Sequence, residues 1–423
     1  MRKILPWLLV VLMLASVFAV TGADKKVTIK FFTGKVETVD WMNELIGKFN
    51  AENPRIQVEQ EFQKDASNVI KVKFASGDIP DITTMYDQGY VDQGKYLDLS
   101  KENQWWARVQ PSIKEMCTDL RSGKTFRIAT NLTMAGLYYN KQIFAELGLK
   151  EATTWEQFVS NLKTIRSKRP DIAPLFVGGK DSWMLGHLIE FMAHGVIKQK
   201  YGTMAARKAF LDNDAAKLAF DAPGGCMETF AQRILELKRD GLFNKDLLTA
   251  TYDNQIEAFA TGKAAMISQG MWALSGILNT NKAMKEIGFS PYPPIIVGTK
   301  PVILAAEDSA YIITADSKNK EEAKAFLDYL FKAKNLKSYS EFLKSPCAFT
   351  DVNADWGPLK DEVTNALKDG VNIGFTNEAP SGFSGDDAGR MVQDLYNGKY
   401  SPKEFAEAYK AAWDKAWNAA NKK

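Results

Sequence analysis

The chain has 423 residues, of which 45% are hydrophobic and 25% charged, with 54 Lys and Arg against 51 Asp and Glu and only 2 His. A single hydrophobic core stops growing at roughly 250–300 residues, so this length predicts two lobes or domains. The near balance of charge, without a basic run, argues against a nucleic-acid partner. Two His residues likewise argue against an imidazole-based hydrolase or a His-rich metal site.

The N-terminus has the pattern of a secretory signal. Two basic residues precede the apolar stretch 4–14, and small residues follow it. This three-part order predicts a signal peptide over residues 1–23, cleaved after Ala19 or Ala23. The stretch is short against the ~20 residues that span a bilayer. Because no Cys lies near either cleavage site, we expect a periplasmic or extracellular protein without a lipid anchor that is not embedded in the membrane.

The mature chain opens with alternating strands and helices. This order predicts a parallel sheet with right-handed crossovers, and ligands bind such sheets beyond the carboxyl ends of the strands. The post-strand segments 33–35 and 86–88 are therefore the first site candidates. The expected strands are 27–32, 56–62 and 81–85, with a helix after each of the first two.

Later segments carry clear helix signals. Thr154 followed by Gln157 predicts a capping box, and Ser401 followed by Glu404 predicts the start of the last helix. The last helix carries an aromatic stripe at four-residue spacing, which we interpret as packing and not as a ligand platform. The other expected elements are a helix ending at Gly262, a buried strand over 264–268 and a helix over 323–331; the stripe is Phe405, Tyr409, Trp413 and Trp417.

The common catalytic motifs are absent from the sequence. It contains no phosphate-binding or dinucleotide-binding glycine pattern, no H-E-x-x-H and no G-x-S-x-G. His187 and His194 are seven positions apart, and we interpret both as ordinary helical residues. The three cysteines, Cys117, Cys226 and Cys347, have no C-x-x-C spacing, and nothing selects a pair among them. We therefore expect no cofactor, no metal site and no disulfide.

Six segments, in order along essentially the whole mature chain, resemble the extracellular solute-binding proteins of ABC sugar importers. The similarity is to the carbohydrate-binding type called family 1, which is like maltose-binding protein. The segments are PDITTMYD at 80–87, GLYYNKQIFAELGL at 136–149, TTWEQF at 153–158, FATGKAAMISQGMWAL at 259–274, SAYIITADSKNKEEAKAFLDYL at 309–330 and NGKYSPKEF at 397–405.

This resemblance implies an α/β fold of two lobes, the periplasmic-binding-protein fold. Each lobe would be a doubly wound sheet flanked by helices, with the ligand in the cleft between them. By analogy, the N-terminal lobe comprises residues 24–129 plus 309–344, and the C-terminal lobe residues 130–308 plus 345–423. The implied function is not enzymatic: a monomer captures a mono- or oligosaccharide, closes by hinge motion and presents it to the transmembrane subunits of an ABC permease.

A sugar suits aromatic rings stacked on its C–H faces and charged or amide groups around its hydroxyl rim. Trp272 follows the strand at 264–268 where the resemblance places a stacking aromatic, and Gly270 would let the backbone come close to the cleft. Trp183 ends the loop-like stretch 178–183, where similar binders also present an aromatic. These three residues lead the predicted binding site.

The other predicted ligand-binding residues lie near strand ends or presumed lobe crossings. Tyr86 could stack and Asp87 accept hydroxyl hydrogen bonds, although an offset of one would put Gln88 in place of Asp87. The Gly-rich stretch 381–387 has a counterpart that faces the cleft in similar proteins. The remaining candidates are Lys35 and Glu37 after the first strand, Asn131 at one crossing, Glu307 and Asp308 at the other, and Phe383 and Asp386 in the Gly-rich stretch.

Two alternative functions stay open at this point. Paired carboxylates such as Asp87 and Glu307 could serve an exported glycoside-cleaving enzyme, which needs no histidine. A cleft rich in carboxylates could also hold a cationic solute such as a polyamine, whose binding would weaken with salt. The sequence does not select the sugar or its number of rings.

Overall fold

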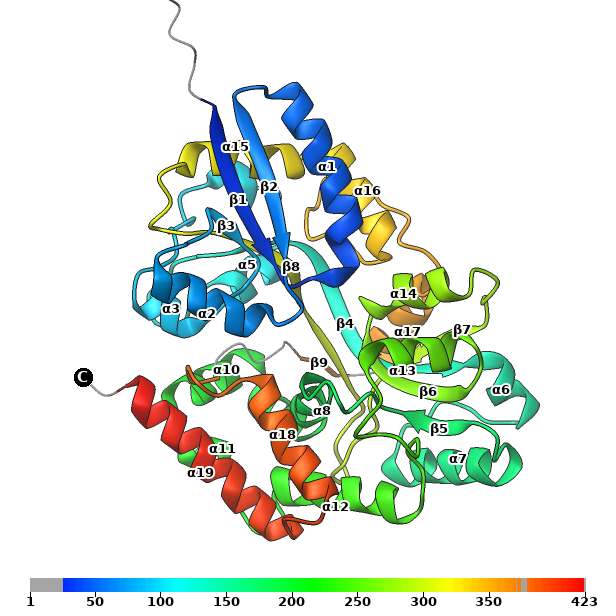
Figure 1. The fold of residues 1–423 in the computed structure, drawn as a ribbon. Coiled ribbons are helices and arrows are strands. Elements are labelled where there is room, and N and C mark those ends of the chain that lie inside the picture. Colours follow the sequence, from blue (N-terminus) through cyan, green and yellow to red (C-terminus); the bar gives the residue numbers. More distant parts are fainter. Residues whose placement is uncertain (1–25, 370, 374–378, 422–423) are drawn as a thin grey trace, which may run out of the picture.

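The computed structural model describes residues 26–369, 371–373 and 379–421. The predicted signal peptide therefore lies outside the described residues. Figure 1 shows two lobes, one above the other, joined by two long strands that run through both. None of the helices in these ranges is both long enough and apolar enough to cross a bilayer. The predicted α/β architecture of two lobes is confirmed.

The first lobe contains the predicted β-α-β-α-β unit. Strand β1 (Val27–Thr33) pairs in parallel with β2 (Ile56–Phe62) and with β3 (Ile82–Thr83), and β3 pairs antiparallel with β8. The connections are α1 (Val39–Glu52), which follows the short turn η1 (Val36–Thr38), and α2 (Ala66–Ser76). The predicted parallel sheet is therefore confirmed.

The other helices of the first lobe come from two distant parts of the chain. They are α3 (Gln88–Asp92), α4 (Asn103–Trp106), α5 (Pro111–Cys117), α15 (Lys320–Leu330) and α16 (Ala333–Leu343). Their shared core also contains Ala348 and Phe349, which the predicted boundary at residue 344 assigned to the other lobe. These residues stay with the first lobe because the chain after α16 returns along it: Gln110 N donates to the Ala348 carbonyl at 2.9 Å.

Strands β4 (Ile128–Asn140) and β8 (Val302–Ile313) pair antiparallel and connect the lobes. Ile128 lies opposite Tyr311 at the end of the pair that packs in the first core. Ala135 lies opposite Leu304 at the end that packs in the second core. Because both strands belong to both lobes, the lobes share one network of nine strands instead of having separate sheets.

The second lobe completes that network with a mixed sheet. Strand β6 (Ala264–Gly270) is antiparallel to β4 and parallel to β5 (Ala173–Phe176); β7 (Ile287–Ser290) pairs with β4, and β9 (Val371–Ile373) with β8. The helical elements are α6 (Lys141–Glu146), α7 (Trp155–Lys168), α8 (Trp183–Leu188), the π-helical turn η2 (Ile189–His194), α9 (Gly195–Tyr201), α10 (Thr203–Asp212), α11 (Ala215–Leu218), α12 (Cys226–Arg239), α13 (Tyr252–Ala260), α14 (Ala273–Thr280), α17 (Lys360–Asp369), α18 (Gly385–Tyr396) and α19 (Pro402–Ala420).

The local signals start the helices where the sequence predicts. Thr154 accepts a hydrogen bond from the Gln157 backbone N–H at the start of α7, although the Gln157 side chain bonds to Thr153 instead. Ser401 and Glu404 form the complete capping box that opens α19. Phe405, Tyr409 and Trp413 of the α19 stripe are buried in the second core, as predicted, whereas the half-buried Trp417 donates to the Leu211 carbonyl at 2.9 Å. The three cysteines are buried free thiols.

Candidate functional site

A cavity of about 570 Å³ lies between the lobes, beside the crossing strands. Its walls come from the loops after β1, β2 and β3, from strand β8, and from the starts of helices α8 and α18. Predicted residues from both lobes meet here: Lys35, Glu37, Tyr86, Trp183, Trp272, Glu307, Asp308 and Asp386.

One wall is built around Lys35, whose side chain is 15% exposed. The Lys35 Nζ lies 2.7 and 2.5 Å from the two carboxylate oxygens of Asp308. Burial lowers the pKa of Lys35, but Asp308, Tyr339 and Glu37 together outweigh this effect and raise the pKa overall, so the amine stays charged. Burial raises the pKa of Glu37, which accepts a hydrogen bond from the Tyr252 hydroxyl at 3.2 Å. Because Tyr252 begins α13, this bond joins the two lobes directly.

A second ion pair lies deeper in the cavity wall. Arg127 Nη2 is 2.6 Å from Glu307 Oε1, and each side chain is only 4% exposed. The guanidinium also lies 3.9 Å from the centre of the Tyr86 ring and donates to the Met116 carbonyl at 3.0 Å. Arg127 therefore holds Tyr86 and Glu307 in place. The sequence analysis missed Arg127, because a single arginine beside a strand carries no motif.

Aromatic rings form the opposite wall. The Trp183 ring centre is 5.2 Å from that of His187, which is 5.8 Å from the Trp272 ring. Trp272 Nε1 donates to Gln269 Oε1 at 2.9 Å, which fixes the indole. Burial lowers the pKa of His187 to about 4, so the imidazole is neutral at pH 7. His187 was interpreted as an ordinary helical residue; its position one turn after Trp183 was the available signal.

Close packing of α8 against α18 positions Trp183 and Asp386. A Cβ on Gly186 would lie 2.0 Å from the Gly385 carbonyl oxygen, and a Cβ on Gly389 would lie 1.7 Å from that of Ser182. Both positions therefore need glycine for the helices to approach this closely. At the same crossing Ser182 Oγ donates to Asp386 Oδ1 at 2.6 Å.

Gly270 has a different role from the one predicted. A Cβ at this position would lie 2.0 Å from the Trp272 ring, so the glycine lets the indole fold over its own strand. Gly270 does not line the cavity. Its effect on the site is to seat Trp272 and not to bring backbone close to a ligand.

Four other predicted residues lie outside the cavity lining: Asp87, Gln88, Asn131 and Phe383. Asp87 caps α3, where its carboxylate accepts the Gly89 N–H at 2.7 Å. Gln88 is buried and bonds to Asp119 at 3.0 Å. Asn131 is fully buried and donates to Ser340 Oγ at 3.1 Å. Each of these polar side chains satisfies a hydrogen bond within the protein, which is why it faces away from the cavity.

Phe383 also faces the protein interior. Its ring centre lies 5.4 Å from Tyr409 and 5.5 Å from Trp413, both on the buried stripe of α19. The Gly-rich stretch thus contributes Asp386 to the cavity and Phe383 to the core. In the part of the chain that the structure describes, no cluster of side chains suits a metal ion.

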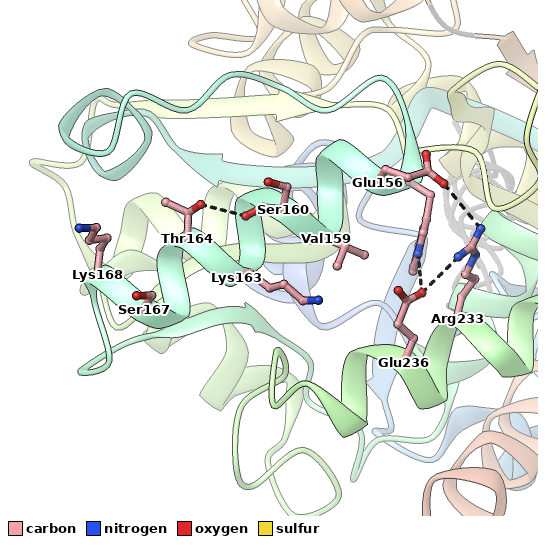
Figure 2. Close-up of a pocket in the computed structure, with 10 residues that line it drawn as sticks. Glu156, Val159, Ser160, Lys163, Thr164, Ser167, Lys168, Arg233 and Glu236 are labelled. Atoms are coloured by element: carbon pink, nitrogen blue, oxygen red, sulfur yellow. Dashed lines mark hydrogen bonds and ion pairs between the residues drawn. The ribbon is translucent and has the colours of Figure 1, made fainter.

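A second groove, of about 530 Å³, lies between α7 and α12 (Figure 2). Several of its polar side chains bond to one another: Trp155 Nε1 and Arg233 Nη1 both donate to Glu236, at 2.8 and 3.2 Å. Figure 2 shows Arg233 between Glu156 and Glu236. None of the predicted residues lines this groove, so the interlobe cavity is the candidate site.

Comparison with known proteins gives consistent matches. The family model described as "Bacterial extracellular solute-binding protein" matches residues 35–337. The "Multiple sugar-binding protein" of Streptococcus mutans is 28% identical over 343 residues, which cover 78% of this chain and 77% of that protein. The "Melibiose/raffinose/stachyose-binding protein MelE" of Bacillus subtilis is 26% identical over 339 residues, covering 79% and 76%. A solved structure, "SBP RafE in complex with raffinose", matches with a TM-score of 0.78 at 25% identity over 94% of this chain and 100% of that one.

Proposed function

Because this chain belongs to the bacterial extracellular solute-binding protein family, we propose that it captures a neutral carbohydrate between its lobes and delivers it to an ABC permease. We further propose that it does so as an exported monomer, released from its signal peptide and without a lipid anchor. The observation that carries the proposal is the composition of the interlobe cavity, where indole rings face carboxylates and hydroxyls. Two relatives are named as sugar-binding proteins, and these names support the same ligand class.

The geometry of the cavity suits a sugar. Trp183 and Trp272 supply flat apolar surfaces for the C–H faces of a pyranose. Asp386 and Asp308 supply acceptors for its hydroxyls, and such charge-assisted bonds are about twice as strong as neutral ones. The volume, about 570 Å³, falls within the roughly 300–1,000 Å³ typical of small-molecule sites.

The charges of the cavity disfavour an anionic ligand. Two of its cations, Lys35 and Arg127, are each paired with a carboxylate. Glu37 and Asp386 add carboxylates beyond those two pairs. The lining also holds one exposed residue of each charge, Lys64 and Asp65. A carboxylate or phosphate on the ligand would therefore face an excess of acidic side chains, and burying it without a partner is costly.

Calorimetric titration tests this proposal. The probes are raffinose and stachyose as neutral sugars, digalacturonate as an anionic one and spermidine as a cation. We expect binding of a neutral sugar that changes little with salt, and binding of digalacturonate at least tenfold weaker. If spermidine binds with an affinity that falls steeply with salt and no sugar binds, the ligand is a cation and not a carbohydrate.

A pair of tryptophan variants locates the site. Trp272→Ala should weaken sugar binding by about 30-fold or more, because truncating an aromatic anchor in a desolvated site costs about 2 kcal/mol or more. Trp417→Ala is the matched control, since Trp417 lies on α19 and bonds to the Leu211 carbonyl away from the cavity. Equal loss of binding in both variants would contradict the stacking role of Trp272.

The positions of Asp87 and Glu307 argue against the glycoside-cleaving alternative. Asp87 caps α3 outside the cavity, and Glu307 is held by Arg127. The two carboxylates named for that reaction are therefore not free to act on one bond together. Mass spectrometry after prolonged incubation with stachyose should find the sugar intact; released galactose would favour an enzyme instead.

A further inference from the structure

Helix α10 of the second lobe makes a buried polar contact with the first lobe. Arg207 of α10 is only 2% exposed. Its Nη1 donates to the Glu115 carbonyl at 3.3 Å, and its Nη2 donates to the Thr118 carbonyl at 3.4 Å. Both acceptors lie at the end of α5, whose residues Ile113 and Cys117 pack in the first core. The neighbours of Arg207 on α10, including Phe210, pack in the second core, so these bonds join the lobes.

The same end of α5 is also held from the first lobe. The Met116 carbonyl, between the two acceptors of Arg207, accepts a bond from Arg127 at 3.0 Å. Arg127 in turn contacts Tyr86 and Glu307 in the cavity wall. Arg127 of the first lobe and Arg207 of the second thus both bond to the backbone of residues 115–118. This stretch of backbone is next to the cavity but does not line it.

We propose that Arg207 is a cross-lobe latch that sets the affinity for every ligand without touching any of them. This inference rests on the proposed function, in which the lobes close around a solute. When the lobes separate, the guanidinium and the α5 carbonyls would return to water, where each is well solvated. The bonds therefore favour the closed form alone, and a larger closed fraction raises apparent affinity by the same factor for all ligands.

The position of Arg207 distinguishes it from the contact between the lobes that Tyr252 and Glu37 make. The bond from Tyr252 to Glu37 lies in the cavity wall, where a ligand can compete for it. In Figure 1, α10 and α13 lie on opposite sides of the crossing strands. Arg207, Glu115 and Thr118 do not line the cavity, so a ligand there does not contact the latch, which predicts an effect that is independent of ligand structure.

The test compares Arg207→Met with a matched arginine inside one lobe. Arg166 also donates to backbone carbonyls, those of Gly241 and Phe243 at 2.8 and 3.0 Å, but all these groups belong to the second lobe. For Arg207→Met we expect raffinose and stachyose to bind about 10- to 100-fold more weakly, which corresponds to about 1.4–2.7 kcal/mol. We expect the same factor for both sugars. Arg166→Met should lower the melting temperature and leave both affinities unchanged.

Stopped-flow tryptophan fluorescence measures the rates of sugar association and dissociation. A purely structural role of Arg207 would leave both rates unchanged. Because the latch forms as the lobes close, Arg207→Met should raise the sugar dissociation rate by most of the affinity factor and change association little. Arg207→Lys, which keeps the charge without the planar fork, should fall between wild type and Arg207→Met.

Several outcomes would overturn the latch. Unchanged affinity in Arg207→Met refutes it while leaving sugar binding intact. Unequal losses for raffinose and stachyose would make Arg207 a ligand contact, and an equal loss in Arg166→Met would reduce the effect to general destabilisation. If the wild-type protein binds none of the probe sugars, the proposed function fails and the latch fails with it.

Discussion

The ion pair between Arg127 and Glu307 offers the sharpest test of how the site is held together. Glu307→Gln would leave a guanidinium that is 4% exposed without its carboxylate. Arg127→Met would leave the carboxylate in the same position, and it would also remove the contact with the Tyr86 ring and the bond to the Met116 carbonyl. The two variants therefore break the same pair at different cost.

The expected magnitudes follow from burial. Removing one partner of a buried ion pair costs about 3–5 kcal/mol, because the remaining charge is uncompensated. Arg127→Met should lie at the upper end, since the lost cation–π contact adds about 0.5–2 kcal/mol. The double variant Arg127→Met with Glu307→Gln leaves no stranded charge, so it should be less destabilised than the sum of the single variants by at least about 2 kcal/mol.

Urea unfolding followed by circular dichroism measures these differences, with the slope of the transition checked for equality among variants. A second probe, tryptophan fluorescence, shows whether both lobes unfold together. Single variants that each cost less than about 1 kcal/mol, the value of an exposed pair, would refute the reasoning. Strict additivity in the double variant would refute it as well.

Three further predictions concern other parts of the site and the core. Gly389→Ala should lower both the melting temperature and the sugar affinity, because its Cβ would lie 1.7 Å from a carbonyl oxygen of the adjoining helix; Gly385→Ala is the control, since its Cβ meets nothing within 4 Å. Tyr252→Phe should weaken sugar binding by about 1 kcal/mol in calorimetry, the typical value of one hydrogen bond, and should raise the pKa of Glu37 further, because the Tyr252 hydroxyl donates to its carboxylate; unchanged affinity would contradict the role of this bond. Burial lowers the pKa of His194 to about 3, so the unfolded chain binds the proton first, and wild-type stability should fall by up to about 1.4 kcal/mol for each pH unit between about 6.5 and 3; in urea titrations His194→Phe should lack that part of the slope.

Local signals in the sequence predicted local structure well. Strand β2 has the bounds that its alternating pattern indicates, and Ser401 with Glu404 opens α19 as a capping box requires. Such patterns depend on neighbours within a few residues, so tertiary packing seldom overrides them. Trp183 and Trp272 were predicted instead from the family resemblance, which implies an aromatic at each position, and both line the cavity.

The contacts that complete the site depend on residues far apart in the chain. Asp87 and Gln88 were predicted from their place after β3, yet the start of α3 takes the Asp87 side chain as its cap. Asn131 lies at the crossing, where the chain after α16 surrounds it with polar partners. Arg127 meets Glu307 across 180 positions. The pattern of residues within one segment does not reveal these contacts, because their partners lie far away in the sequence.

The shared crossing strands also govern the order in which the protein can fold during synthesis. Strand β3 is neighboured on one side by β8, with Ile82 opposite Ile313, and the first core needs the helices that follow β8 as well as Phe349. A ribosome working at about 5–20 residues per second must therefore add more than two hundred further residues before the first lobe can close its core. Until then the lobe has an open sheet edge and exposed apolar side chains. The first lobe therefore completes its core only after residue 349 has been added, late in synthesis.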